Sequence, residues 1–165
     1  YCDPRRHANA QAIAALNEML LAAQSEGDFH FIISSAFRAI WEQKVLWEGK
    51  LSTCPDYGSD PYNSPLKVMP PNCSEHTTGL AFDILSESCP HSDVSYANTP
   101  EGRWLAANAH RFGFILRYPN DKQNITGVQF EPWHFRFVGK EAAAYIHSHS
   151  LCLEEYLGQT PQAGD

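Results

Sequence analysis

An aspartate inside an apolar strand constrains the fold of this chain more than any other feature of its sequence. Asp83 lies in LAFDIL (80–85), whose composition is typical of a short buried strand. Alternation along such a strand would place Asp83 and the small Ala81 on one face, opposite the larger apolar side chains. Because a buried carboxylate is costly unless it has a partner or a metal, the fold must supply Asp83 with one or the other.

A histidine precedes this strand at a spacing that allows the two polar side chains to meet. Residues 74–83 read SEHTTGLAFD, so His76 and Asp83 are separated by a Thr-Thr-Gly turn. Gly79 can adopt backbone angles that are closed to other residues. The turn could therefore bring His76 beside Asp83.

A second polar stretch, EPWHFRFVG (131–139), contributes a glutamate and another histidine. Glu131 and His134 would face opposite sides of a regular strand, so they can serve one site only if the chain bends between them. Pro132 favours such a bend, because proline is confined to strand starts, edges and bulges. Trp133 is interpreted as core that also forms a wall of a pocket.

These residue types together predict a zinc site. Catalytic zinc takes three nitrogen, sulfur or carboxylate ligands from the protein and keeps one position open. His76, Asp83 and His134 would supply the three ligands, and Glu131 would act as a general base. The alternative is that His76 is a loop histidine, Asp83 a strand-end carboxylate and Glu131 a surface charge.

Arg38 follows a predicted strand (29–34) where the chain leads into a helix. A fixed guanidinium there could bind a carboxylate or polarise a carbonyl oxygen. Three other arginines are interpreted as solvated surface charges: Arg103, Arg117 and Arg136. The remaining six histidines (7, 30, 91, 110, 147 and 149) show no spacing that indicates a partner.

The composition limits the classes of partner and compartment. The chain has 165 residues and a formal net charge of −7, which argues against nucleic acid or an anionic membrane surface as a partner. No apolar run is long enough to span a membrane. The first residues, YCDPRRHANAQ, lack a signal core and are typical of a processed domain, so a removed signal peptide or membrane anchor stays open.

The five cysteines form no CxxC pair, which disfavours a cysteine zinc site or a thioredoxin-like motif. Cys54, Cys73 and Cys89 lie in the loop-rich middle of the chain, where a disulfide could staple irregular backbone. Cys2 and Cys152 could join the two ends. The odd count leaves at least one thiol unpaired within the chain, and the pattern favours an oxidising, extracytoplasmic setting.

The periodicity predicts one α+β domain over 1–165, with its core at about 8–157. It would be a small, mostly antiparallel sheet with helices packed around it and the zinc site at the sheet. We expect a monomer. Helices are predicted at 8–25 (with Asn9 as cap), 40–49 (ending at Gly49), 100–113 and from 140; strands at 29–34, 80–85, 114–119 and 125–130; and long loops at 52–75 and 86–99.

The two motifs resemble those of a known family. SEHTTGLAFD is similar to the SxHxxGxxxD pattern, and EPWHFRFVG to the second motif, of zinc D-alanyl-D-alanine carboxypeptidases of the VanY type. These bacterial enzymes shorten peptidoglycan stem peptides. The resemblance runs from ISSAFR to LEEYL. The sequence departs from the family pattern at Asn72, where glycine is usual, and at Phe37 and Phe137, where tyrosine is expected. The stretch TCPDYGSDPYNSP is an unusual insertion.

The resemblance implies that His76, Asp83 and His134 bind zinc and that Glu131 is the catalytic base. It further implies that Arg38 binds substrate and stabilises the oxyanion, with Ser74 and Gln43 at the substrate's terminal carboxylate.

Three alternatives stay open. One is a different cut by the same chemistry: an L,D-carboxypeptidase, a D,D-dipeptidase or an endopeptidase. The others are a zinc-stabilised binding module without activity and a disulfide-stapled interaction domain without metal. The sequence favours neither cell-wall maturation nor antibiotic resistance as the biological role.

Overall fold

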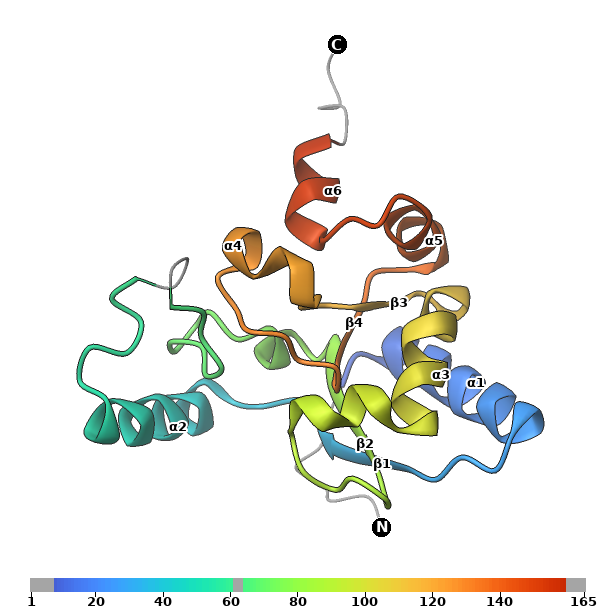
Figure 1. Ribbon diagram of the computed structural model, residues 1–165, viewed down its shortest axis with the longest axis horizontal. Helices are drawn as coiled ribbons and strands as arrows, with labels where there is room; N and C mark the ends of the chain where they lie inside the picture. The colour runs from blue at the N-terminus through green and yellow to red at the C-terminus, as the bar shows by residue number, and fades with distance from the viewer. Residues whose placement is uncertain (1–7, 61–63, 160–165) are drawn as a thin grey trace.

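A four-stranded sheet forms the centre of the molecule (Figure 1). The computed structural model describes residues 8–60 and 64–159. The strands are β1 (Phe31–Ser35), β2 (Ala81–Ser86), β3 (Phe114–Leu116) and β4 (His134–Phe137). They lie in the order β1-β2-β4-β3, and every neighbouring pair is antiparallel. The predicted α+β fold with a small antiparallel sheet is confirmed.

Helices surround this sheet. They are α1 (Ala10–Glu26), α2 (Ile40–Thr53), α3 (Pro100–Asn108), α4 (Gln123–Thr126), α5 (Lys140–Ser148) and α6 (Leu153–Gln159). Four short 3₁₀ helices join them: η1 (Glu75–Thr78), η2 (Val94–Asn98), η3 (Ala109–Phe112) and η4 (Asn120–Lys122). In Figure 1, α1 and α3 lie together on one side of the sheet, whereas α2 and the loop after it extend away on the other.

The main core lies where α1 and α3 pack against the sheet. Asn9 caps α1 as predicted, because its side-chain oxygen accepts hydrogen bonds from the first turn of the helix. Leu16 and Met19 of α1 are buried in one cluster with Phe82 and Ile84 of β2. Burial of each such side chain contributes about 1.5–3 kcal/mol. This packing fixes β2, and with it the alternation that turns Asp83 to the opposite face.

One predicted helix boundary and one predicted continuous helix are wrong. Gly49 does not end its helix: it is exposed within α2, which continues to Thr53. A glycine inside a helix costs about 1 kcal/mol, too little to stop a helix that has favourable residues beyond it. The predicted helix 100–113 is instead α3 followed by η3, and it ends as expected at Gly113, which has φ 87°.

The strand predicted at 125–130 does not form. The helix α4 occupies its first residues and ends at Gly127, whose φ of 68° interrupts any extended run. Val128 pairs only through an isolated bridge to Leu66, which belongs to the long loop 52–75. The strand beside β3 is β4. Residues 125–130 therefore anchor the long loop, a contact between distant segments that local periodicity cannot show.

Of the five cysteines, the four that lie within the described residues are free thiols: Cys54, Cys73, Cys89 and Cys152. A disulfide among Cys54, Cys73 and Cys89 is therefore not present. The predicted pair of Cys2 and Cys152 and the C-terminal PQAGD fall partly or wholly outside the described residues. No helix within the described ranges is long and apolar enough to cross a membrane.

Candidate active site

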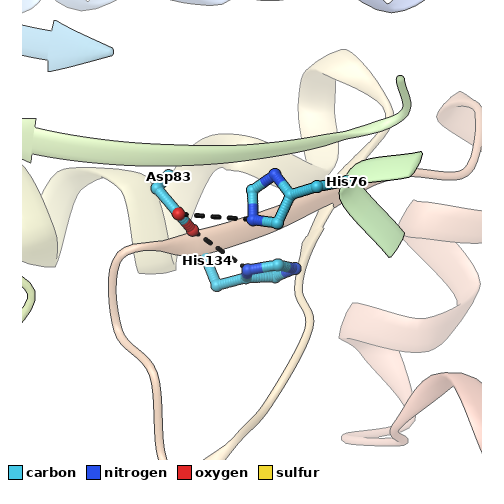
Figure 2. A group of neighbouring side chains, drawn as sticks. All are labelled: His76, Asp83 and His134. Atoms are coloured by element: carbon cyan, nitrogen blue, oxygen red, sulfur yellow. Dashed lines mark hydrogen bonds and ion pairs between the residues drawn. The ribbon is translucent and has the colours of Figure 1, made fainter. Parts of the chain in front are cut away.

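Three neighbouring elements bring together the side chains predicted to bind a metal. His76 lies in η1, Asp83 in β2 and His134 in β4 (Figure 2). Asp83 and His134 are directly opposite each other in the antiparallel ladder, so their side chains share a face. Gly79 ends η1 with φ 69°, the left-handed turn that returns the chain from His76 into β2.

The ligand atoms of this trio converge. The carboxylate of Asp83 contacts both rings from one side, with Oδ2 3.3 Å from Nε2 of His76 and Oδ1 3.0 Å from Nδ1 of His134 (Figure 2). One ligand atom from each residue lies within 4.8 Å of the others. All three side chains are buried. Two imidazoles and a carboxylate in this arrangement fit the donor set that zinc prefers.

A backbone contact fixes which nitrogen of His76 is available. Nδ1 of His76 lies 2.6 Å from the carbonyl oxygen of Ala36, which can only accept a hydrogen bond. Nδ1 therefore donates to that carbonyl, which leaves Nε2, the nitrogen nearest Asp83, as the atom of His76 that a metal could bind. The backbone N–H of Arg38 also donates to the carbonyl of His76, which ties η1 to the end of β1.

Burial and charge shift the pKa values within the trio in opposite directions. Burial alone would raise the pKa of Asp83, but the two histidines hold it well below its usual range. Burial alone would lower the pKa of His134, but the carboxylates of Asp83 and Glu75 raise it to about 9. In the absence of metal the site therefore holds a proton where a cation would bind, because the buried negative charge requires a positive partner.

Glu131 lies beside this trio because the chain bends at Pro132. The N–H of His134 donates to the carbonyl of Glu131 at 3.0 Å, which closes a turn. The turn brings Oε2 of Glu131 to 3.7 Å from Nδ1 of His134. Burial, assisted by the nearby charge of Asp83, raises the pKa of Glu131 to about 8. The bend that the sequence required between these residues is confirmed.

Arg38 is held at the edge of the trio. Its Nη1 donates to Oε1 of Gln43 at 2.8 Å, and its Nη2 donates to Ser35 at 3.0 Å and lies 3.8 Å from Oδ2 of Asp83. Gln43 is almost fully buried and donates in turn to the carbonyl of Met69. An arginine has five N–H donors, so these contacts leave donors for a ligand.

These residues line one pocket of about 290 Å³. The pocket joins the metal trio to Glu131, Arg38 and Gln43, and it includes the buried Ser74 and Trp133. All eight residues singled out from the sequence therefore lie around a single cavity. Asn72, two residues before Ser74, has φ 67°. Asparagine tolerates this left-handed conformation better than most residues, so the turn survives without the glycine usual in the family.

Sequence reasoning missed several residues of the pocket. Lys67 lies with its Nζ 5.2 Å from the centre of the Trp133 ring, and Tyr118 packs against His134 at 4.9 Å between ring centres. Both line the pocket. Lys67 reaches it from the long loop, so nothing in its local sequence marks it. Tyr118 follows β3 and reaches the site only through the pairing of β3 with β4.

The interpretation of Arg117 as a surface charge is wrong. Its side chain is buried, its Nε donates to Oε1 of Glu75 at 2.7 Å, and its two Nη groups donate to the carboxylate of Glu154. Glu75 also lines the pocket. The sequence placed Glu75 next to His76, but its partners lie 42 and 59 residues away along the chain, and no spacing rule joins them.

Comparison with known proteins identifies the family. The family model described as VanY, D-alanyl-D-alanine carboxypeptidase, matches residues 5–140. A D-alanyl-D-alanine carboxypeptidase of Enterococcus faecalis is 40% identical over 149 residues, which are 86% of this chain and 52% of that protein. The chain spans about half the length of the curated relatives it matches.

Solved structures of related enzymes share the fold of this chain. The LD-carboxypeptidase LdcB, whose structure concerns peptidoglycan recognition, has a TM-score of 0.87 and 36% identity, over 98% of this chain and 73% of that one. A variant of the vancomycin resistance D,D-pentapeptidase VanY, in complex with Zn(II), has a TM-score of 0.77 and 37% identity, over 94% of this chain and 86% of that one. With four-fifths of its length matched by the family model and its fold shared with these enzymes, this chain belongs to the VanY family of D-alanyl-D-alanine carboxypeptidases.

Proposed function

We propose that this chain is a zinc-dependent carboxypeptidase that removes the C-terminal D-alanine from peptidoglycan stem peptides. The observation that carries the proposal is the convergence of His76, Asp83 and His134 at a pocket that also holds a buried carboxylic acid and a fixed guanidinium. A zinc site with a purely structural role would need neither of these two groups. Similarity to a relative that binds Zn(II) supports the choice of metal.

His76, Asp83 and His134 would hold the metal. When bound, zinc would supply positive charge that polarises the substrate carbonyl, acidifies a bound water and lowers the pKa of Glu131. Glu131 would then accept a proton from the attacking water and deliver it to the departing amine. Its carboxylate is already turned toward the trio by the bend at Pro132.

Arg38 and its neighbours would bind the negatively charged groups of the substrate. The remaining N–H groups of Arg38 would stabilise the oxygen that becomes negative during attack. Gln43 uses its Oε1 to hold Arg38 and one amide hydrogen to bind Met69, which leaves one hydrogen for the terminal carboxylate. Ser74 would bind the same carboxylate. A substrate that continued beyond this residue would have no carboxylate here, so these buried donors would stay unpaired. Cleavage within a longer peptide would therefore be disfavoured.

The likeness to LdcB supports a second candidate, an L,D-carboxypeptidase that shortens tetrapeptide stems by the same chemistry. The two candidates differ in the residue that precedes the scissile bond and share every catalytic group named above. Either substrate belongs to the cell envelope, so we place the activity outside the cytoplasm, in the envelope or secreted. Stem peptides are the proposed partners, and no nucleic acid is among them.

One experiment tests the proposal and separates the candidates. The zinc-loaded protein is incubated, with and without chelator, with pentapeptide stem, tetrapeptide stem and free D-Ala-D-Ala, and the products are identified by mass spectrometry. We expect chelator-sensitive loss of one D-alanine from the pentapeptide. Cleavage of the tetrapeptide alone would assign the L,D-carboxypeptidase, and cleavage of the dipeptide alone a dipeptidase. No cleavage by protein shown to hold zinc would refute a carboxypeptidase and favour an endopeptidase or a binding module.

A further inference from the structure

Two buried polar atoms at the rim of the metal trio have no hydrogen-bond partner. They are Nε2 of His134 and Oε2 of Glu75, and they lie 3.8 Å apart. A buried group without a partner costs about 1–3 kcal/mol. The separation exceeds a hydrogen bond by about 1 Å, so a small rotation of either side chain would satisfy both atoms at once. The two atoms are therefore placed to pair with each other.

The chemistry of His134 as a metal ligand calls for such a partner. Its Nδ1 faces Asp83, toward the other ligand atoms. An imidazole that binds a metal through Nδ1 has its proton on Nε2, and that N–H needs an acceptor to fix the ring and its tautomer. In this pocket Oε2 of Glu75 is a carboxylate oxygen that lies 3.8 Å from Nε2.

Glu75 is itself held rigidly from the opposite side. Its Oε1 accepts a hydrogen bond from Nε of Arg117 at 2.7 Å, and Nη1 of Arg136 lies 3.5 Å from its Oε2. Arg117 is anchored by Glu154 of α6 through two hydrogen bonds of 2.7 and 3.0 Å. The arrangement uses Oε1 of Glu75 for the anchor and leaves Oε2 near two donors, Nη1 of Arg136 at 3.5 Å and Nε2 of His134 at 3.8 Å.

From this geometry we infer that Glu75 is a positioning residue, which accepts the Nε2–H of His134 and so holds Nδ1 ready as a metal ligand. The inference rests on the proposed function only in taking His134 as a ligand of zinc. Glu75 does not contact the reacting atoms. Its role is to orient His134 and to increase the basicity of the imidazole, so its loss should appear first in metal affinity.

The test compares zinc affinity among three variants, measured by chelator competition without substrate. Glu75→Ala removes the acceptor and should weaken binding about 10- to 100-fold, the usual effect of losing such a partner. Glu75→Gln keeps an amide oxygen and should lose less. Glu155→Gln is the matched control, because this neighbouring carboxylate of α6 pairs with Lys122 and not with Arg117, Glu75 or His134, and it should stay within about threefold of wild type by the same reasoning.

A spectroscopic measurement adds a readout that a purely structural role would not change. In ¹⁵N-histidine NMR spectra of the zinc-loaded protein, His134 should show a protonated Nε2 whose hydrogen exchanges slowly. Glu75→Ala should accelerate that exchange, and Glu155→Gln should not.

Three outcomes would overturn the inference. Wild-type affinity in Glu75→Ala with an unchanged Nε2–H signal would show that Glu75 does not position His134. An equal loss in Glu155→Gln would show that the lower affinity reflects the stability of the fold and not the contact of Glu75 with His134. A wild-type protein that binds no zinc would refute the proposed metal site as well, whereas intact zinc binding without any peptidase activity would refute the function alone and leave the role of Glu75 standing.

Discussion

Among the described residues, two pairs of histidine rings lie in contact, and the pairs differ in geometry and in the charge around them. His76 and His134 meet edge to face, with ring centres 5.0 Å apart and planes at 84°. His110 of η3 and His147 of α5 stack face to face at 3.7 Å and 6°. Each pair borders a cavity of similar size, about 290 Å³ for the first and about 310 Å³ for the second.

The difference lies in the charge around the rings. Asp83 contacts both His76 and His134, and with Glu75 it raises the pKa of His134 to about 9. Burial and the positive charges of its neighbours lower the pKa of His110. Within the described residues, only the first pair belongs to a group of three converging ligand side chains. Proximity of histidines alone does not provide a set of ligands for a metal; here a buried carboxylate that contacts both rings completes a set of three.

The largest expected effect comes from removing one histidine of the first pair. His76→Ala should weaken zinc binding by more than about 100-fold, which is more than the loss expected when a residue that only hydrogen-bonds a ligand is removed. Turnover should be abolished because zinc is lost. Zinc per chain, measured by competition with a chelator, checks this. His110→Ala is the matched control in the second pair and should bind zinc normally. Equal zinc loss in both variants would show that the first pair is not a specific zinc ligand set.

Glu131→Gln should give the next largest effect, on turnover alone. The amide keeps the shape of the side chain but cannot accept a proton, so turnover should fall about 10²- to 10⁴-fold while zinc stays bound. Turnover is followed by release of D-alanine, and zinc content by metal analysis. Glu48→Gln, an exposed change in α2, serves as the control. If Glu131→Gln turned over substrate at the normal rate with its zinc in place, another group would have to be the base.

The two pairs should also respond to pH with opposite sign. In metal-free protein the raised pKa values of His134 (about 9) and Glu131 (about 8) stabilise the fold at low pH, and that stability is lost as the pH rises. Between about pH 6.5 and 9 the free energy of unfolding should fall by a few kcal/mol, or several degrees in Tm. Zinc takes the place of the proton, so added zinc should raise Tm more at pH 9 than at pH 6.5.

Thermal melts of metal-free and zinc-loaded protein across this range check the prediction. Asp83 does not interfere, because its lowered pKa affects stability only below its ordinary value of 3.8. A metal-free protein whose Tm rises from pH 6.5 to 9 would show that the protons are not held as the geometry indicates.

Local sequence signals predicted the parts of the site that depend on short-range structure. Asp83 within an apolar strand, the turn at Gly79 and the bend at Pro132 are local signals, and each placed a side chain at the site. Contacts made by long-range pairing left no such signal. The burial of Arg117 depends on Glu75 and on Glu154 of α6, which lies 37 residues away.

Two further features escaped prediction for the same reason. His110 and His147 stack only because η3 packs against α5. The segment 125–130 has the composition of a strand, but the left-handed turn at Gly127 interrupts it. The bridge between Val128 and Leu66 instead joins this segment to the long loop. Local propensity is overridden where tertiary partners decide the outcome.

The smallest expected effect belongs to the second pair. The lowered pKa of His110 means that its contribution to stability is present above pH 6.5 and is lost as the pH falls through its folded value. His110→Phe can still stack on His147 but cannot be protonated, so the variant should melt like wild type at pH 7.5, within about 0.5 kcal/mol. It should be relatively more stable than wild type at pH 5.5, with unchanged zinc affinity and turnover. His91→Phe, at an exposed position, should show no such pH-dependent gain. A loss of zinc affinity in His110→Phe would mean that the stacked pair communicates with the metal trio across the sheet, and the two pairs could no longer be treated as separate.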